Sequence, residues 1–169
     1  SNNSEPTGIT YNELDGFFYV TADSGSFRGI ARYDSSLSSP LAVINPSDDV
    51  PTATDIEGIT SDPSNGVLYA VDGNGGGRQV LTYDANLNYQ SSFSVASELS
   101  DAEGIAFGCG HLFVLSDPDN KVVQYTTSGT MIEEYDIGGF SPTPANAQGL
   151  SFGPTSDPFD DPANKALYI

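Results

Sequence analysis

The segment Gly58-Ile59-Thr60 carries a signature, glycine followed by an aliphatic and then a small residue, that decides how this chain folds. The same signature occurs at Gly8-Ile9-Thr10, Gly104-Ile105-Ala106 and Gly149-Leu150-Ser151. The four glycines are separated by 50, 46 and 45 positions (58 − 8, 104 − 58 and 149 − 104). A chain that repeats itself at a nearly constant period builds one structural unit several times.

Each copy predicts the same succession of strands. A short first strand follows the signature, an apolar second strand predicts burial on both faces, and an alternating third strand predicts a position further from the core. A fourth strand follows after the third one ends near a tyrosine. The predicted second strands are 17–20, 67–71, 111–115 and 166–169, the third strands 29–34, 79–84 and 121–125, and the fourth strands 40–44, 91–95 and 131–137.

The repeat predicts an all-β fold of the β-propeller class, with about three and a half four-stranded blades. Propeller blades hold four strands in a period of roughly 40–50 residues, whereas a two-sheet sandwich, the structural alternative, needs no such regular repetition. We expect one repeat region over 1–169, divided as 5–54, 55–100, 101–145 and an incomplete 146–169. Because rings usually have four to eight blades, we expect a fragment of a longer protein or a ring completed by further chains.

Composition excludes several classes of partner. The chain has 23 acidic and 5 basic residues, a net charge of −18, which repels phosphate backbones and anionic membranes, so we expect no nucleic-acid partner. It lacks an apolar run long enough for membrane insertion. Cys109, the single cysteine, excludes an intrachain disulfide. The low lysine content with abundant Asp and Gly predicts a secreted bacterial, hence extracellular, protein.

Acidic residues gather in the loops that precede the first strands and in those that join the second and third strands. Successive strands are antiparallel, so these loops are expected at the same edge of the propeller. A hard cation such as Ca²⁺ takes six to eight oxygen ligands, which such loops supply, although Asp also simply shapes turns. The candidate metal ligands are Asp23, Asp55, Glu57, Asp72, Asp101, Glu103, Asp117 and Asp119.

Five stretches resemble known propeller families. The hairpins 23–28 and 72–78, each leading to a Tyr-Asp strand end, resemble NHL-type repeats. The openings 55–59 and 101–105, and the last segment 148–169, are similar to secreted bacterial propellers of the SdiA-regulated and phytase-like esterase groups. The resemblance implies an extracellular interaction module, in some members with bound calcium, and in distant relatives a metal-dependent hydrolase.

Two functions of different classes follow. The first is a non-catalytic module that binds a protein, a glycan or its own copies, stabilised by calcium, with no catalytic or cofactor-binding residue assigned. The second is a calcium-dependent hydrolase of the lactonase, esterase or phytase type. In the second reading Glu57 and Glu103 are the paired carboxylates that act as general acid and base. Their periodic recurrence favours a structural role instead.

Overall fold

The computed structural model describes residues 3–25, 28–140, 146–161 and 163–169, and these form strands with a single short 3-10 helix among them. Among these described residues, no helix has the length and apolarity needed to cross a bilayer. The elements are β1 (Asn3–Asn12), β2 (Phe17–Gly25), β3 (Gly29–Tyr33), β4 (Ala42–Ile44), η1 (Pro46–Asp48), β5 (Ile56–Ser61), β6 (Leu68–Asp72), β7 (Gln79–Tyr83), β8 (Tyr89–Ser94), β9 (Gly104–Gly108), β10 (His111–Ser116), β11 (Lys121–Thr126), β12 (Met131–Asp136), β13 (Ser151–Pro154) and β14 (Lys165–Tyr168).

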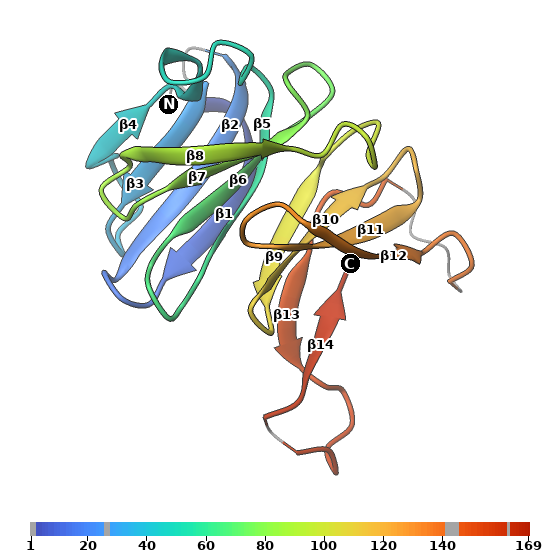
Figure 1. Cartoon of the computed structure of the whole chain (residues 1–169). Helices are drawn as coiled ribbons and strands as arrows, with labels where there is room; N and C mark the ends of the chain where they lie inside the picture. Colours follow the sequence, from blue (N-terminus) through green and yellow to red (C-terminus); the bar gives the residue numbers. More distant parts are fainter. Residues whose placement is uncertain (1–2, 26–27, 141–145, 162) are drawn as a thin grey trace.

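The strands form four separate antiparallel sheets, each from consecutive strands. The first sheet is β1-β2-β3-β4, the second β5-β6-β7-β8 and the third β9-β10-β11-β12, while β13 and β14 form a two-stranded C-terminal hairpin. Figure 1 shows them following one another in chain order, from blue to red. The predicted fold class, an all-β partial propeller, is confirmed, and the two-sheet sandwich is excluded.

The core lies between successive sheets rather than in one centre. Three hydrophobic clusters occupy the three boundaries, where each fully buried leucine contributes about 1.5–3 kcal/mol to stability. The first cluster contains Tyr19 of the first sheet and Leu68 of the second, and the next contains Val71 of the second sheet and Leu112 of the third. In the third cluster Leu115 of the third sheet packs with Leu167 of the hairpin.

The first strands converge on a common axis. They line a cavity of ≈ 250 Å³ whose walls include all four signature glycines, Gly8, Gly58, Gly104 and Gly149. A Cβ on Gly58 would lie 2.9 Å from the Ile105 nitrogen, and a Cβ on Gly104 would lie 3.1 Å from the Gln148 carbonyl oxygen. The signature therefore exists because neighbouring first strands approach too closely for a side chain.

The connections between first and second strands vary in length. β9 and β10 are joined by Cys109 and Gly110, both with positive φ, in a tight turn. β13 and β14 are joined by the segment 155–164, in which Phe159 is 95% exposed. The pairing of the two strands is regular in both cases.

Some predicted strand positions are wrong. β2 continues to Gly25, so Asp23 lies in a strand rather than in the predicted hairpin loop, while Ser26 and Phe27 of that loop fall outside the described residues. Every residue of β7 is buried, so the expected position further from the core is wrong for this third strand, whereas β11 keeps an alternating burial pattern. The reason is that β7 lies in the middle sheet and supplies Val80 to one hydrophobic cluster and Leu81 to the other, so both of its faces are covered.

Candidate functional site

Five acidic residues lie at one edge of the propeller, which we call the carboxylate edge: Asp23, Asp55, Glu57, Asp101 and Glu103. Asp23 is near the end of β2, and the others lie at or just before the starts of β5 and β9. Antiparallel order brings the end of a second strand and the start of a first strand to the same side. The five residues are close enough to interact, because the negative charge of each of the other four raises the pKa of Glu57.

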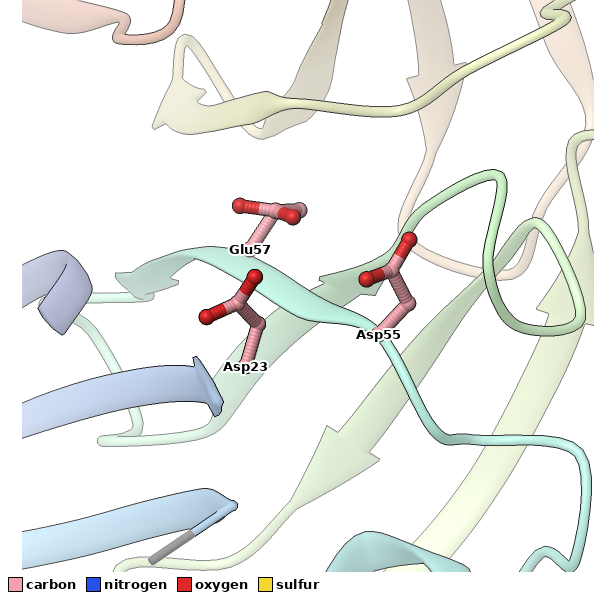
Figure 2. A group of neighbouring side chains, drawn as sticks. All are labelled: Asp23, Asp55 and Glu57. Atoms are coloured by element: carbon pink, nitrogen blue, oxygen red, sulfur yellow. The ribbon is translucent and has the colours of Figure 1, made fainter. Parts of the chain in front are cut away.

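Asp23, Asp55 and Glu57 form the closest group, the carboxylate triad. One oxygen from each lies within 4.8 Å of the others, and Figure 2 shows the three side chains turned toward one another. Two ligands of one Ca²⁺ ion lie at most about 5 Å apart, because each Ca–O distance is about 2.3–2.6 Å. The spacing and the all-oxygen donor set fit a hard divalent cation.

One carboxylate oxygen of Asp23 lacks a hydrogen-bond partner in the described part of the chain. Its Oδ1 atom is buried and makes no hydrogen bond with any described residue. Among the described residues the ion pair that forms joins Lys121 and Glu134 on the third sheet, so no Lys or Arg neutralises the triad. A buried carboxylate oxygen without a compensating donor is unfavourable, and a cation is one way to compensate it.

The two glutamates of the carboxylate edge, Glu57 and Glu103, have raised pKa values. Burial, followed by the charges of Asp55, Glu103, Asp23 and Asp101, raises the pKa of Glu57 to about 8. Burial also raises the pKa of Glu103, and the charges of Asp101, Asp117 and Asp55 add to it. Like charges held close together disfavour ionisation, so the edge prefers to bind either a proton or a cation.

Asp72 is a structural residue rather than a free ligand. Its side chain is fully buried, and Oδ1 accepts hydrogen bonds from the backbone N–H groups of Thr54 (3.1 Å) and Asp55 (2.9 Å). Oδ2 accepts from the Gly77 N–H and from the Gln79 amide. Both oxygens are engaged, so Asp72 holds the β6–β7 loop against the entry to β5.

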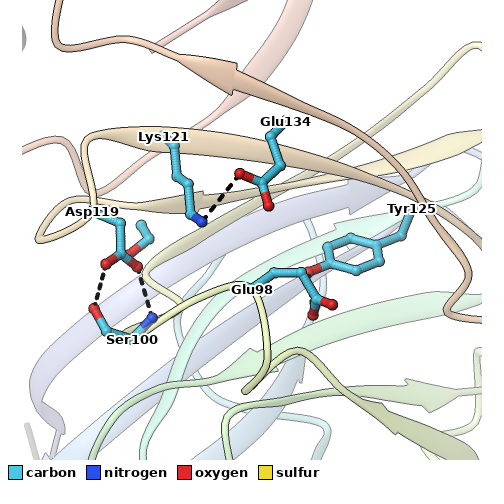
Figure 3. Close-up of polar contacts among 7 residues, drawn as sticks. Glu98, Ser100, Asp119, Lys121, Tyr125 and Glu134 are labelled. Carbon is cyan, nitrogen blue, oxygen red and sulfur yellow. Dashed lines mark hydrogen bonds and ion pairs between the residues drawn. The ribbon is translucent and has the colours of Figure 1, made fainter.

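Asp119 is also engaged within the fold. Ser100 donates to it through its backbone N–H (2.7 Å) and its hydroxyl (2.8 Å), as Figure 3 shows. Ser116 donates a third hydrogen bond. Burial raises the pKa of Asp119, but these donors outweigh burial and lower it overall. Asp117 accepts a hydrogen bond from the Ala147 N–H at 2.8 Å. Neither Asp117 nor Asp119 belongs to the carboxylate triad.

The loop 73–77 contributes backbone donors that the sequence did not suggest. The Asn74 N–H donates to Asp101 at 2.7 Å and the Gly75 N–H donates to Asp55 at 2.6 Å. A Cβ on Gly75 would lie 2.8 Å from the Asp55 carboxylate, so the loop can come this close to the acidic side chain because Gly75 has no side chain. The run of glycines in this loop is the sequence feature that could have indicated that its backbone lies close to other groups.

The sequence matches no protein-family model and no curated protein sequence. Solved propeller structures do resemble the fold. A streptogramin B lyase is 21% identical with a TM-score of 0.62, and the match covers 90% of this chain and 46% of that one. The nidogen/laminin complex gives 16% identity, a TM-score of 0.66, and coverage of 88% and 52%. A virginiamycin B lyase from Staphylococcus aureus is 20% identical with a TM-score of 0.62, and the match covers 88% of this chain and 46% of that one.

These likenesses establish the propeller fold and nothing finer, because fold does not fix function. The neighbours include lyases and a chain from a protein–protein complex, so both enzymes and interaction modules are built on this architecture. The chain spans about half the length of the structures that it matches.

Proposed function

We propose that this chain is a non-catalytic, calcium-stabilised binding module that acts outside the cell. The observation that carries the proposal is the carboxylate triad, three side chains within 4.8 Å whose buried Asp23 oxygen has no donor among the described residues. In the proposal Ca²⁺ binds Asp23, Asp55 and Glu57 and fixes the carboxylate edge. A protein or glycan partner then binds at that edge. The NHL-type and SdiA-regulated-like resemblance of the repeats supports an extracellular interaction role.

Thermal unfolding with and without calcium tests the cation site. A ligand that binds only the folded state raises Tm with its concentration. We expect CaCl₂ to raise the Tm of the chelator-treated protein, and Asp23→Asn and Glu57→Gln to abolish most of that shift. Isothermal titration should show the same loss of calcium affinity.

Glu13→Gln is the matched control. Glu13 is exposed and lies in the turn between β1 and β2, at the end of β2 away from Asp23. This variant should keep the calcium shift of the wild type. An equal loss in all three variants would mean that calcium acts on net charge rather than on the triad.

A metal-dependent hydrolase is the second candidate, and the raised pKa of Glu57 favours it. In the metal-free protein a carboxyl group with a pKa of about 8 holds its proton near neutral pH, as a general acid requires. In this second candidate Glu57 is therefore the acid, and Asp23 and Asp55 hold the cation without it. Calcium-dependent turnover of simple lactone, ester or phosphoester substrates that Glu57→Gln abolishes would support this candidate. Calcium binding without any turnover would leave the binding module as the function.

A further inference from the structure

A cavity of ≈ 440 Å³ opens where the first strands end, and the proposed function does not use it. All four sheets contribute to its walls, which include Tyr11, Ser61, Phe107, Ser151 and Phe152, and we call it the distal cavity. The carboxylate triad lies around the start of β5, whereas Ser61 is the last residue of β5, so the two sites are at opposite ends of this strand. Pockets of about 300–1,000 Å³ are typical of small-molecule sites.

The repeat places an aromatic ring at the distal cavity in three of the four sheets. Tyr11, Phe107 and Phe152 each follow their signature glycine by three residues, and all three line the cavity. In the second sheet the same position is Ser61. A serine is much smaller than an aromatic ring, so the row of rings is interrupted at β5, between the sheet that carries Tyr11 and the sheet that carries Phe107. The interruption leaves room for a ligand.

Each of the three rings is held in place by a ring from a second strand. The pairs are Tyr11 with Phe18, Phe107 with Tyr69 and Phe152 with Phe113, at centroid distances of 5.0, 6.3 and 5.1 Å. Phe107 lines the distal cavity although Tyr69 of the preceding sheet stacks on it with planes inclined by only 2°. A ring that is already fixed on one side loses little freedom when a ligand covers another side.

Hydroxyl groups lie beside the rings in the walls of the distal cavity. The Thr60 Oγ1 atom accepts a hydrogen bond from the Phe107 N–H at 3.1 Å, and its own proton reaches no acceptor among the described residues. The Ser61 Oγ atom donates to the Tyr11 carbonyl oxygen at 3.2 Å. The Ser151 hydroxyl makes no hydrogen bond with any described residue. Because a hydroxyl group both donates and accepts, these groups suit a ligand that has hydroxyls of its own.

Charge narrows the class of ligand further. Among the described residues that line the distal cavity, Glu13 is the single charged one, and the chain as a whole carries a charge of −18. Phosphates, carboxylates and acidic sugars are therefore repelled. The faces of aromatic rings are partially negative, so they attract the slightly positive C–H groups on one face of a sugar ring. Rings beside hydroxyl groups, without a basic residue, fit a neutral sugar.

We propose that the distal cavity binds a neutral pyranose sugar, either free or as one unit of a glycan. The sugar occupies the space beside Ser61, and its C–H face packs on Tyr11 or Phe107. Its hydroxyl groups form hydrogen bonds with Thr60 and Ser151. This is a second site, beyond the proposed calcium-stabilised edge, because no residue of the carboxylate triad takes part.

Saturation-transfer NMR with methyl glucopyranoside and methyl galactopyranoside tests the proposal. We expect saturation to pass from the protein to the C–H protons of at least one of these sugars, with a Kd on the order of 1 mM for a ligand of about 13 non-hydrogen atoms. The anionic methyl glucuronide should bind more weakly. A calcium chelator should leave sugar binding unchanged, so failure of the calcium site and failure of the sugar site are separate results.

Two variants with matched controls locate the site. Ser61→Phe supplies the ring that the other three sheets carry at this position, so it should fill the distal cavity and abolish saturation transfer. Ser91→Phe makes the same change at an exposed position of β8 and should bind as the wild type does. Tyr11→Ala removes a stacking face and should weaken binding about tenfold. Phe159→Ala, which removes a ring that is 95% exposed and outside the cavity, should have no effect.

A neutral trisaccharide distinguishes the two sources of the sugar. Tighter binding than that of the methyl glycoside identifies a glycan chain as the ligand, and equal binding identifies a single sugar. All variants should keep the wild-type circular dichroism. No transfer to any neutral sugar, transfer that persists in both Ser61→Phe and Tyr11→Ala, or binding of choline in place of the glycosides would overturn the proposal.

Discussion

At the scale of single residues, the signature glycines are fixed by the distance between first strands. Gly58→Ala would place a methyl group 2.9 Å from the Ile105 nitrogen, an approach that carbon atoms do not tolerate without a backbone shift. We expect this substitution to destabilise the protein by about 1–3 kcal/mol. Urea unfolding followed by circular dichroism measures it. Gly139→Ala, which meets open space, should change stability much less, and equal losses in the two variants would contradict the packing explanation.

Glu57 makes the stability of the metal-free protein depend on pH. Its pKa rises from 4.5 to about 8 on folding, mainly through burial, so the folded state favours the protonated form. The folded state is therefore penalised progressively as pH rises from about 4.5 to about 8, and the penalty is constant above that range. Glu57→Gln, which stays neutral, should unfold at a higher urea concentration than the wild type, by a margin that grows through this window. A margin that is the same at both ends would show that the carboxyl group does not titrate as its surroundings dictate.

At the scale of elements, one buried carboxylate connects two segments that are distant in sequence. Asp72 at the end of β6 accepts hydrogen bonds from Thr54 and Asp55 before β5 and from Gly77 and Gln79 at the start of β7. Asp72→Asn keeps the volume but replaces one acceptor with a donor, leaving buried N–H groups without partners. We expect a loss of about 2–3 kcal/mol in the free energy of unfolding.

Hydrogen exchange separates this local effect from general destabilisation. In Asp72→Asn the amides of residues 54, 55 and 77 should lose protection first. Asp136→Asn is the control, since Asp136 is exposed and accepts its hydrogen bond from the nearby Gly138 N–H. Uniform loss of protection across the chain would argue that Asp72 acts on the whole fold.

The elements themselves could be predicted because their cause is local. Periodic glycines and apolar second strands lie within a few residues of one another, and they correctly indicate three four-stranded sheets and a hairpin. The candidate site was predicted only as a pool of eight carboxylates. Sequence spacing does not reveal which of them meet backbone donors from another repeat, as Asp119 does with Ser100 and Asp101 with Asn74. The spacing of the carboxylate oxygens, which only the folded structure reveals, groups Asp23, Asp55 and Glu57 as the triad.

At the scale of the whole molecule, the charge of −18 opposes the compact state through self-repulsion. Moderate NaCl should raise Tm by on the order of a few degrees, because screening weakens repulsion between exposed carboxylates. Differential scanning calorimetry with a chelator present measures the shift without calcium. KCl at equal ionic strength should give the same result, and a Tm that ignores both salts would mean that repulsion is unimportant.

The variable connection between first and second strands makes the protein a scaffold for grafted sequences. A tight turn of Cys109 and Gly110 and the longer segment 155–164 both join strands with regular pairing, so this connection does not control the sheet. A foreign epitope inserted beside Phe159 would be displayed in solvent while the hydrophobic clusters stay as they are. The segment 155–164 leaves the end of a first strand, whereas the triad lies where a first strand begins, so display and cation binding use opposite edges of the sheets and can be engineered separately.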